Sequence, residues 1–475
     1  MIKINSNKKQ SLKLATIVNA KPSKSIPKGS FSRFNILKKY DEYQKAIKER
    51  EPENMAQLLD NLKGIKNLHG QIEDHYNKLA EVQTKRKAIE KEVKSDNKNL
   101  EKISLLKELK KQSLALSKPI EEMESKVYDY CDSLPNLVDA TNPSTKPRIV
   151  SWINPKHEIN NSAGEEYQGD VDYSKTYIKD EKRDHYSVLT RQKSLLDFYT
   201  ASNTSGSNCY YLFDELVLLE NALITYALNF ARSKGFGIST TPSFAKTPLI
   251  AACGYRPTQR DMDSQIYTLE NTKQALIATS EITLAGYEML KVLSKSQLPI
   301  KKCAVSRAFR KEADAQGTGV RGLYRVHEFN KVELFVWTTP EKSDETLEEL
   351  KDLQVELIKS LGLTAQVLQM PNNDLGAPAY KKYDIECWMP GRGTFGEITS
   401  TSNCTDFQSR RLSTRYRDHS DAGNDTSFKF VHTLNGTCMA VPRVILAIVE
   451  NYYNPETNKV TVPDVLVPLM GMKEF

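Results

Sequence analysis

The sequence predicts an α+β protein, in which an N-terminal antiparallel two-helix coiled-coil arm precedes a larger domain built on a mostly antiparallel sheet flanked by helices. Apolar residues recur every 3.5 residues over about residues 53–127, which is typical of a coiled-coil seam. Strand-like runs within residues 307–335 indicate a hairpin, and not the alternating strands and helices of a parallel sheet. The 475 residues are too many for one compact core and enough for two or three domains.

The first element is a basic N-terminal segment. Residues 1–40 hold nine lysines, one arginine and no acid, and they carry +10 of a formal net charge of only +7. The rest of the chain is therefore slightly acidic, so any affinity for nucleic acid must come from local patches. Residues 1–30 are rich in Ser and Lys and free of acids, which predicts a mitochondrial transit peptide. The alternative is a disordered basic tail that helps to hold RNA.

The second element is a helical arm domain, predicted over residues 31–135. A polar break near residues 95–99 separates two apolar series, so we expect two antiparallel helices joined there. A kink or restart is expected near Ser117, because Pro119 removes a helical hydrogen bond. The first helix would project on the order of 60 Å at ~1.5 Å per residue. Residues 82–112 carry ten Lys or Arg against five acids, so the tip of the arm is basic.

The remaining elements are a linker and a large domain. Residues 136–180 are rich in Pro, Asn, Ser and Asp, which predicts a linker, and residues 181–475 form the large domain. Helices are expected at 188–200, 213–234, 280–296, 341–361 and 438–453, and strands at 303–310, 322–337, 363–370, 380–389 and 394–402. Gly391 and Gly393 indicate a turn.

Cysteine usage and hydropathy exclude several classes of protein. The seven cysteines include no C-x-x-C pair, which argues against a disulfide framework or a thiolate zinc site, so no zinc is expected. No apolar run approaches the ~18–20 residues that a membrane-spanning helix needs, so no membrane partner is expected.

Residues 307–335 hold the most informative pattern in the chain. Arg310 and Arg325 stand on either side of a polar, glycine-bearing loop. Arginine suits phosphate because its planar guanidinium binds bidentately and stays charged. Phe329 offers an aromatic ring to a flat base. The segment therefore predicts a nucleotide site, and the alternative, an ordinary hairpin with surface arginines, loses ground once further motifs are counted.

This hairpin resembles motif 2 of the class II aminoacyl-tRNA synthetases, and the chain from about residue 34 to 475 resembles the seryl-tRNA synthetases. Short motifs follow in that family's order: DH at 184–185, SGSNCYYL at 205–212, GFGISTTPSF at 235–244, TSE at 279–281, EITSTSN at 397–403 and TLNGTCMAVPR at 433–443. The resemblance implies that residues 181–475 are a class II synthetase catalytic domain. Motif 1, with Pro242, implies a homodimer interface.

For ATP, the resemblance implies that Arg310 contacts the α-phosphate and the serine carboxylate. Glu312 would accept a hydrogen bond from the adenine amino group, and Phe329 would stack on the base. Arg443 would cover the other face of the base or bind the γ-phosphate. The implied ATP-binding residues are Arg310, Lys311, Glu312, Val326, His327, Glu328, Phe329, Glu397, Ile398, Thr399, Ser400 and Arg443.

Catalysis would rest on Arg310, Glu397 and Arg443. Glu397 and Ser400 would also hold Mg²⁺, since this ion favours one or two carboxylates together with substrate oxygens. ATP and Mg²⁺ are therefore the implied cofactors. Lys311 stands where the family more often has a small residue, and the loop at 313–320 lacks the charges common there, which puts contacts with the tRNA acceptor end in doubt.

For serine, the resemblance implies that Thr279 and Glu281 take the ammonium group and that Glu333 takes the hydroxyl. Thr437, with Asn435 nearby, would complete the side-chain pocket. A site that hydrogen-bonds a hydroxyl rejects an analogue without it by up to ~10⁴–10⁵. As alternatives, the two glutamates are solvated charges and Thr437 is the N-cap of the last helix. The implied serine-binding residues are Thr279, Ser280, Glu281, Arg310, Glu333, Asn435 and Thr437.

The resemblance implies a serine–tRNA ligase that forms seryl-adenylate from L-serine and ATP, releases pyrophosphate and esterifies tRNA(Ser). The expected state is a homodimer in the mitochondrial matrix of a eukaryote such as a fungus, with the arm on the long variable arm of the tRNA. Two alternatives remain at this point: a cytoplasmic enzyme of the same family, and a non-catalytic synthetase-like protein that binds tRNA.

Overall fold

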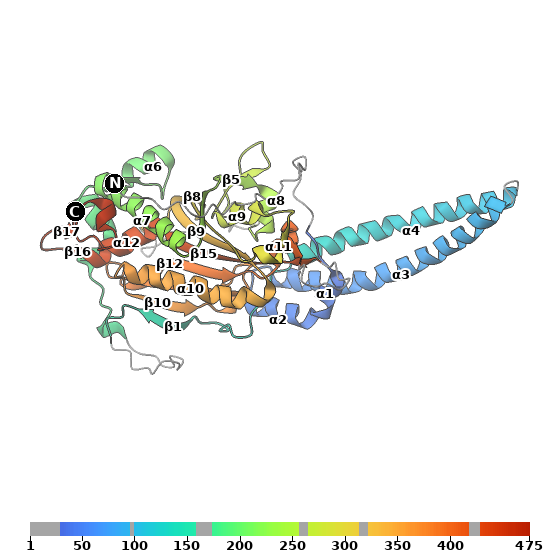
Figure 1. The fold of residues 1–475 in the computed structure, drawn as a ribbon, viewed down its shortest axis with the longest axis horizontal. Coiled ribbons are helices and arrows are strands. Elements are labelled where there is room, and N and C mark those ends of the chain that lie inside the picture. The colour runs from blue at the N-terminus through green and yellow to red at the C-terminus, as the bar shows by residue number, and fades with distance from the viewer. Residues whose placement is uncertain (1–28, 96–98, 158–172, 256–264, 313–321, 418–427) are drawn as a thin grey trace, which may run out of the picture.

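The structure is a computed structural model that describes residues 29–95, 99–157, 173–255, 265–312, 322–417 and 428–475. Figure 1 shows a long two-helix arm that projects from one end of a larger domain, in which helices cover a sheet. An α+β architecture of this kind was predicted and is confirmed. Residues 1–28 of the predicted transit peptide and the motif 2 loop at 313–320 lie outside the described residues.

Two long antiparallel helices form the arm, as predicted. Helix α3 spans Met55–Ser95 and α4 spans Leu100–Ser133, and two short helices, α1 (Arg33–Lys38) and α2 (Tyr40–Arg50), pack at their base. Buried residues along the seam include Leu58, Leu62, Ile65 and Ile72 of α3, and Leu109, Ile120, Val127 and Cys131 of α4. A helix of 41 residues extends about 60 Å, so the tip of the arm lies far from the sheet.

The predicted restart near Ser117 is wrong, because α4 continues through Pro119 as one helix. Proline removes the hydrogen bond to the carbonyl four residues earlier, and that residue, Ala115, is exposed to solvent. Immediately after the proline, Ile120 is buried in the seam with α3. Packing of the apolar face therefore keeps the helix continuous despite one missing bond.

A buried arginine attaches the arm to the large domain. The Arg50 guanidinium donates hydrogen bonds to the carbonyl of Leu137 and to three carbonyls within residues 375–379, at 2.6–3.2 Å. Just after the arm, the Asn136 amide donates to the carbonyl of Cys404 at 2.9 Å. Both contacts satisfy buried backbone groups, so the base of the arm is fixed on the large domain.

The large domain is built on an eight-stranded sheet in the order β1-β10-β11-β12-β15-β9-β8-β4. The strands are β1 (Arg148–Ile153), β4 (Gly237–Thr240), β8 (Ile300–Phe309), β9 (Glu328–Thr338), β10 (Ala365–Gln369), β11 (Lys381–Met389), β12 (Thr394–Asn403) and β15 (His432–Ala440). Each neighbouring pair of these described strands is antiparallel except β4 and β8. The predicted mostly antiparallel sheet is thus confirmed.

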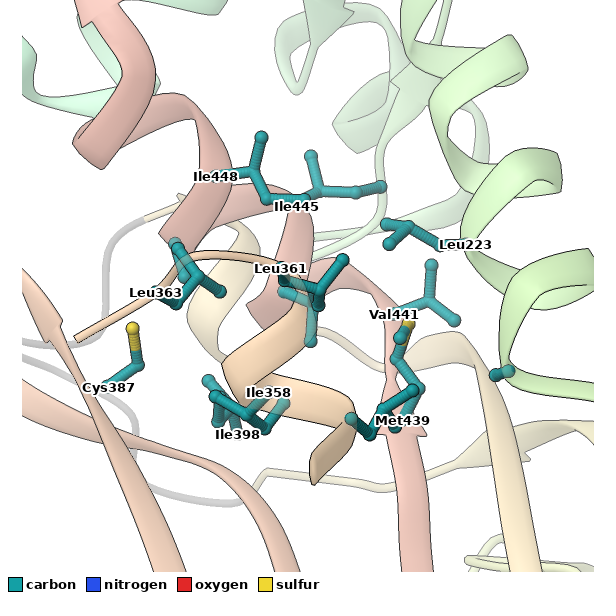
Figure 2. Packing of buried hydrophobic residues seen from close by; sticks show 14 of the residues in the cluster. Leu223, Ile358, Leu361, Leu363, Cys387, Ile398, Met439, Val441, Ile445 and Ile448 are labelled. Atoms are coloured by element: carbon teal, nitrogen blue, oxygen red, sulfur yellow. The ribbon is translucent and has the colours of Figure 1, made fainter. Parts of the chain in front are cut away.

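The two faces of the sheet carry different layers. On β9, the side chains of Leu334 and Val336 join the core under helices α7 (Asp214–Ser233), α10 (Ser343–Ser360) and α12 (Val441–Tyr452). Figure 2 shows this core, in which Leu223 of α7, Ile358 of α10 and Ile445 of α12 lie above the strands. The alternating residues Phe335 and Trp337 face a second core with three short helices, α8 (Thr247–Ala252), α9 (Glu281–Tyr287) and α11 (Phe407–Leu412).

The remaining elements are short and complete the rims of the domain. They are the helices α5 (His185–Ser187), α6 (Tyr199–Ser205) and α13 (Val467–Met470), and the strands β2 (Leu196–Asp197), β3 (Tyr211–Leu212), β5 (Phe244–Lys246), β6 (Gln274–Leu276), β7 (Val292–Ser294), β13 (Arg415–Arg417), β14 (Lys429–Phe430), β16 (Tyr453–Asn454) and β17 (Lys459–Val460).

Four expected elements differ in the structure. The helix expected at 188–200 is a π-helical turn, Val188–Gln192, followed by the strand β2, which pairs with β3. The helix expected at 280–296 ends at Tyr287, and β7 follows it because Val292 pairs with Arg415 of β13. In both cases a distant partner strand recruits residues whose local pattern favours a helix.

The third and fourth differences lie in motif 2 and motif 3. The strand expected at 322–337 begins only at Glu328, since Gly322 starts a 3₁₀ turn with a positive φ of 79°. The helix expected at 438–453 begins at Val441. The alternative role of Thr437 as an N-cap is therefore wrong, because Thr437 lies inside strand β15.

Candidate active site

A pocket lies over β9, β12 and β15, where strand β8 has ended and helix α12 begins. The pocket is lined by Arg310, Glu312, Leu323, Tyr324, Arg325, Val326, Phe329, Lys331, Glu397, Ile398, Ser400, Thr437, Ala440, Pro442 and Arg443. The structure thus brings together most of the predicted ATP-binding residues, from segments more than one hundred residues apart.

Strand periodicity explains how β9 serves this pocket. Successive side chains of a strand point to opposite faces. Phe329, Lys331 and Glu333 therefore share one face, while Val332 and Leu334 enter the core beneath the helices. Phe329 and Lys331 line the pocket directly.

A β-bulge in β12 places the predicted metal-holding residues. Ile385 of β11 pairs with Thr399, yet the next residue of β11 pairs with Glu397, so Ile398 is the extra residue. In a regular strand, Glu397 and Ser400 would point to opposite faces because they are three residues apart. The bulge corrects this, and both residues line the pocket.

The predicted base-binding end of the pocket holds two arginines and an aromatic ring. The guanidinium carbon of Arg310 lies 5.4 Å from the centroid of the buried Phe329 ring. The backbone N–H of Arg310 donates to the carbonyl of His327 at 2.9 Å, which fixes the end of β8 beside the start of β9. The half-exposed Arg325 donates to the Glu312 carboxylate at 2.9 Å. An incoming base amino group would share that carboxylate with Arg325.

Glu397, Arg443 and Tyr324 form a connected group at the predicted phosphate end of the pocket. Arg443 donates to the Glu397 carboxylate at 3.1 Å and to the Tyr324 carbonyl at 3.1 Å. The Glu397 backbone N–H donates to the Tyr324 hydroxyl oxygen at 3.2 Å. Burial opposes ionisation of Glu397, but the charges of Arg443 and Lys382 outweigh it and lower the pKa of this carboxyl below its usual value. Glu397 is therefore ionised at neutral pH.

The predicted serine pocket centres on Glu281, which is 5% exposed. Gln408 donates to one carboxylate oxygen of Glu281 at 2.6 Å, and the Tyr255 hydroxyl donates to the other at 3.4 Å. Burial and the nearby charge of Glu333 raise the pKa of Glu281 to about 7. The predicted alternative of a solvated surface charge is wrong for both glutamates, because Glu333 is only 1% exposed.

Lys331 joins the two predicted halves of the serine pocket, and the motif analysis missed it. Its ammonium lies 2.6 Å from a carboxylate oxygen of Glu333 and donates to the Thr279 hydroxyl at 3.2 Å. Lys331 could have been identified from strand alternation, because it lies midway between Phe329 and Glu333 and must point to the same face. Thr437 pairs directly across β15 and β9 with Glu333, so the two side chains are neighbours on the sheet.

Some predicted ATP-binding residues lie outside the pocket lining. The Glu328 side chain is half-exposed and pairs with Arg307 at 3.2 Å. His327 contacts the Tyr267 hydroxyl through its ring, and the Lys311 ammonium lies 5.8 Å from the Tyr267 ring centroid. Thr399 is buried, and its hydroxyl donates to the carbonyl of a β15 residue. Their contributions to a nucleotide would come from backbone groups or from supporting contacts.

Two further predicted serine-binding residues and the predicted interface residue have distinct surroundings. Ser280 is fully buried next to Glu281, and Asn435 is 8% exposed, with its amide 3.7 Å from the Cys404 sulfur. Pro242 is exposed between β4 and β5, close in sequence to the exposed apolar residues Ile238 and Phe244. This exposed apolar segment fits the predicted role in an interface.

Tyr324 and Arg392 were also missed. Tyr324 lines the pocket, and the Arg392 guanidinium carbon lies 3.6 Å from its ring centroid. Tyr324 occupies a 3₁₀ turn that the sequence had assigned to a strand, and the turn signal at Gly391 and Gly393 gave no indication of a functional arginine. Within the described residues, no helix has the length and apolar character that crossing a membrane would require.

Residues 267–452 match the family described as the tRNA synthetase class II core domain for Gly, His, Pro, Ser and Thr. The chain is 42% identical over 453 residues to the mitochondrial serine–tRNA ligase of Saccharomyces cerevisiae, covering 95% of this chain and 96% of the relative.

Two solved structures are also similar over nearly the whole chain. Seryl-tRNA synthetase from Pyrococcus horikoshii, complexed with ATP, superimposes with a TM-score of 0.82 at 30% identity, covering 94% of this chain and 99% of that one. Cytoplasmic serine–tRNA ligase from Naegleria fowleri, in complex with AMP, gives a TM-score of 0.77 at 28% identity, covering 95% and 99%. The order of the motifs, the pocket and these similarities agree, and the chain belongs to the serine–tRNA ligase family of class II aminoacyl-tRNA synthetases.

Proposed function

We propose that this protein is a serine–tRNA ligase that activates L-serine with ATP and then esterifies tRNA(Ser). The observation that carries the proposal is a pocket lined by two arginines, Arg310 and Arg443. Lys331 also lines this pocket and reaches the buried polar groups Glu333 and Thr279. The same family membership supports the use of ATP, since relatives of known structure hold ATP or AMP.

The first step requires a serine carboxylate oxygen to attack the α-phosphorus of ATP, while the bond to the β-phosphate oxygen breaks and pyrophosphate leaves. Serine carboxylate is already ionised, so no general base is needed. Arg310 would hold the carboxylate and the α-phosphate together and stabilise the charge that builds on phosphorus. Phe329 would stack on adenine, and Arg443 would bind the nucleotide at the opposite end of the pocket.

The residues at the phosphate end also fit Mg²⁺. Glu397 is an ionised carboxylate, and Ser400 offers a hydroxyl on the same face of β12. One carboxylate plus one hydroxyl, completed by phosphate oxygens and water, is a donor set that Mg²⁺ favours. The ion would neutralise charge on the phosphates. Arg443, which now pairs with Glu397, is free to turn toward phosphate once a cation shares that carboxylate.

The serine side of the proposal rests on polar groups that are held in place. Glu281 and Thr279 would bind the ammonium, and Glu333 and Thr437 would bind the hydroxyl. Each of these residues is at most 5% exposed. Alanine would leave the hydroxyl-binding groups without a partner, which disfavours it strongly.

For the second step, we infer that a terminal ribose hydroxyl of tRNA attacks the adenylate carbonyl and AMP leaves. The basic arm would bind the variable arm of tRNA(Ser) mainly through its backbone and shape. A homodimer that uses the exposed segment around Pro242 would let the arm of one subunit deliver tRNA to the other. The domain limits proposed from the sequence, an arm over 31–135, a linker over 136–180 and a catalytic domain over 181–475, fit this division of labour.

We further propose that the enzyme acts in the mitochondrial matrix. The acid-free composition of residues 1–30 and the 42% identity to a mitochondrial relative support this location. A cytoplasmic enzyme with a basic tail remains the competing proposal, and it differs in the tRNA that the enzyme must charge.

The test uses purified protein that begins near residue 30, with labelled serine and separate mitochondrial and cytosolic tRNA pools. Preferential charging of mitochondrial tRNA is expected. Charging of cytosolic tRNA alone would overturn the location but keep the activity. Absence of both charging and serine-dependent ATP–pyrophosphate exchange would favour the non-catalytic alternative. Arg310→Ala serves as the catalytically dead control, because it removes the cation that joins the two substrates.

A further inference from the structure

A buried hydrogen-bonded chain lies behind the pocket and involves a histidine and a glutamate that no step above uses. His185 is 1% exposed and Glu450 of α12 is 0% exposed. The His185 Nδ1 atom lies 2.7 Å from a Glu450 carboxylate oxygen. At the other side of the ring, the backbone N–H of Leu323 donates to His185 Nε2 at 3.2 Å. Leu323 lines the pocket and precedes Tyr324.

This arrangement fixes the protonation of the ring. Because Nε2 accepts a hydrogen bond from a backbone N–H, it cannot carry a proton itself. In a neutral ring the single proton must therefore sit on Nδ1, which points at a carboxyl oxygen of Glu450. Glu450 thus selects one tautomer of His185, and only that tautomer can hold the backbone of Leu323. Close packing supports the same contact, since a Cβ at Gly322 would lie 2.2 Å from Nε2.

The same glutamate also holds a second segment. The second carboxylate oxygen of Glu450 accepts a hydrogen bond from the backbone N–H of Arg392 at 3.2 Å. The Arg392 guanidinium carbon lies 3.6 Å from the Tyr324 ring centroid. Tyr324 is therefore held from two sides, through its neighbour Leu323 and through its ring. One carboxylate at the end of α12 organises both supports.

Tyr324 passes this order on to the site. Its hydroxyl oxygen accepts from the Glu397 backbone N–H, and its carbonyl accepts from Arg443, at 3.2 Å and 3.1 Å. Those two residues form the phosphate end of the proposed ATP site. The proposed serine-binding groups Glu281 and Lys331 lie on α9 and β9, where they bond to Gln408 and Thr279.

A metal site is the competing explanation for this cluster, since ligand atoms of Asp184, His185 and Glu450 lie within 4.8 Å of one another. Hydrogen bonds already occupy both ring nitrogens of His185 and both carboxylate oxygens of Glu450. Asp184 is likewise engaged by the backbone N–H and the hydroxyl of Ser187, at 3.0 and 2.8 Å. A metal would have to break several of these bonds, so the hydrogen-bonded reading is preferred.

We propose that His185 and Glu450 are positioning residues for serine activation, which hold Leu323 and Tyr324 and thereby align Glu397 and Arg443 for ATP. This inference rests on the proposed function. It assigns a role in ATP binding and turnover to a histidine that would otherwise be a structural core residue.

The decisive variant is Glu450→Gln, which keeps the shape of the side chain but offers one acceptor where the network needs two. The amide N–H₂ must then face either the Nδ1–H of His185 or the N–H of Arg392, and one contact is lost. We expect the KM for ATP in serine-dependent ATP–pyrophosphate exchange to rise roughly 10–100-fold, the range found when a supporting partner of a site is removed. The KM for serine should stay within about twofold. Tyr452→Phe is the matched control on the same helix, because its hydroxyl bonds only to the Leu361 carbonyl outside the network.

A pair of histidine variants separates positioning from packing. The amide of His185→Gln can reach toward Leu323 as Nε2 does, whereas His185→Asn retains only a group near Nδ1. We expect the Gln variant to keep a clearly lower KM for ATP than the Asn variant at similar thermal stability.

The outcomes distinguish the inference from the function on which it rests. If the unaltered protein lacks exchange activity, the proposed function fails. If it is active and Glu450→Gln leaves the KM for ATP within about twofold, or raises both KM values equally with loss of stability, the positioning role is refuted. Loss of wild-type exchange on treatment with a zinc chelator, restored by zinc, would instead support the metal explanation.

Discussion

At the scale of single residues, burial of charge dominates the properties of the serine pocket. Burial and the neighbouring Glu333 raise the pKa of Glu281 to about 7, well above the usual value near 4.5. The folded protein therefore holds this proton more tightly than the unfolded chain does. As a result, the contribution of Glu281 to the free energy of unfolding falls as pH rises from about 4.5 to about 7. Binding of the serine ammonium group would favour the ionised form of Glu281, because the positive charge stabilises the carboxylate.

From this we expect the KM for serine to rise as pH falls from 8 to 6, since Glu281 must lose its proton to bind the ammonium. The ammonium itself stays charged over this range. The measurement is the KM for serine in ATP–pyrophosphate exchange at several pH values. Glu281→Gln should have a higher KM that no longer varies with pH, and a pH-independent KM in the unaltered enzyme would contradict the assignment.

Lys331 carries the second prediction at this scale. Lys331→Met would leave the Glu333 carboxylate buried without its cation, and breaking a buried pair typically lowers stability by about 3–5 kcal/mol. Lys301→Met is the matched control, because Lys301 pairs with Glu349 at 2.9 Å on the surface, where a pair contributes about 0–1 kcal/mol. Urea unfolding of both variants is the measurement. Equal losses would show that Lys331 is not electrostatically special.

The sequence indicated most of the site residues but not all, because only some of them stand in distinctive motifs. The resemblance to seryl-tRNA synthetase motifs identified Arg310, Glu397 and Arg443. Lys331 and Tyr324 were overlooked, since a lysine in a strand and a tyrosine in a turn are common without function. The contacts of His185 with Leu323 and Glu450 join segments that are far apart in the chain, so no local sequence pattern encodes them.

At the scale of elements, the junction between the arm and the large domain depends on one side chain. Arg50 is 6% exposed, and burial lowers its pKa to about 10, yet it remains charged at neutral pH. Its guanidinium satisfies four carbonyls, from Leu137 and from residues 375–379. A lysine ammonium at this position could not span the same set, because it is a compact charge with three donors.

We expect Arg50→Met to loosen the seat of the arm, so charging of tRNA falls at least about tenfold while pyrophosphate exchange stays within about twofold. A buried carbonyl without a hydrogen-bond donor costs about 1–3 kcal/mol. We therefore expect the base of the arm to shift so that water can reach these carbonyls. Lys45→Met on the same helix is the control, since Lys45 makes only an exposed pair with Glu49. Equal loss of exchange and charging would indicate general unfolding.

Element boundaries show where local sequence runs out. The helix expected at 188–200 gives way to β2 because β3 pairs with it, and α4 passes through Pro119 because α3 packs along it. The bulge at Ile398 is also invisible to a period-two pattern, although it brings Glu397 and Ser400 to one face. Partner elements decide each of these cases, and a pattern read along one segment does not include its partner.

At the scale of the whole molecule, the arm and the pocket are separate parts, and the proposed function requires both to act on one tRNA. The arm extends about 60 Å from the sheet, so its tip cannot touch the pocket of its own subunit. The fold was predictable because the 3.5-residue repeat and the hairpin signals are strong. How two chains combine was not, since an interface depends on surfaces from different parts of the sequence.

The proposed dimer makes a prediction that separates the two possible routes for tRNA. One partner would be Arg310→Ala, with an intact arm and an inactive pocket. The other would lack residues 66–120, which shortens the arm but keeps the base around Leu58, Leu62 and Val127 and leaves the pocket intact. Each homodimer alone should charge tRNA poorly, while only the arm-shortened one should retain exchange.

When the two proteins are mixed and allowed to exchange subunits, random pairing makes about half of the dimers mixed, each with one usable arm and one usable pocket on different subunits. If the arm delivers tRNA to the partner's pocket, charging should recover to roughly a quarter of the wild-type level. If each arm serves its own pocket, mixing restores nothing, because no subunit has both parts. The contrast is decisive because both outcomes use the same proteins, and recovery that disappears when Phe244→Glu is added would assign the exposed segment around Pro242 to the interface.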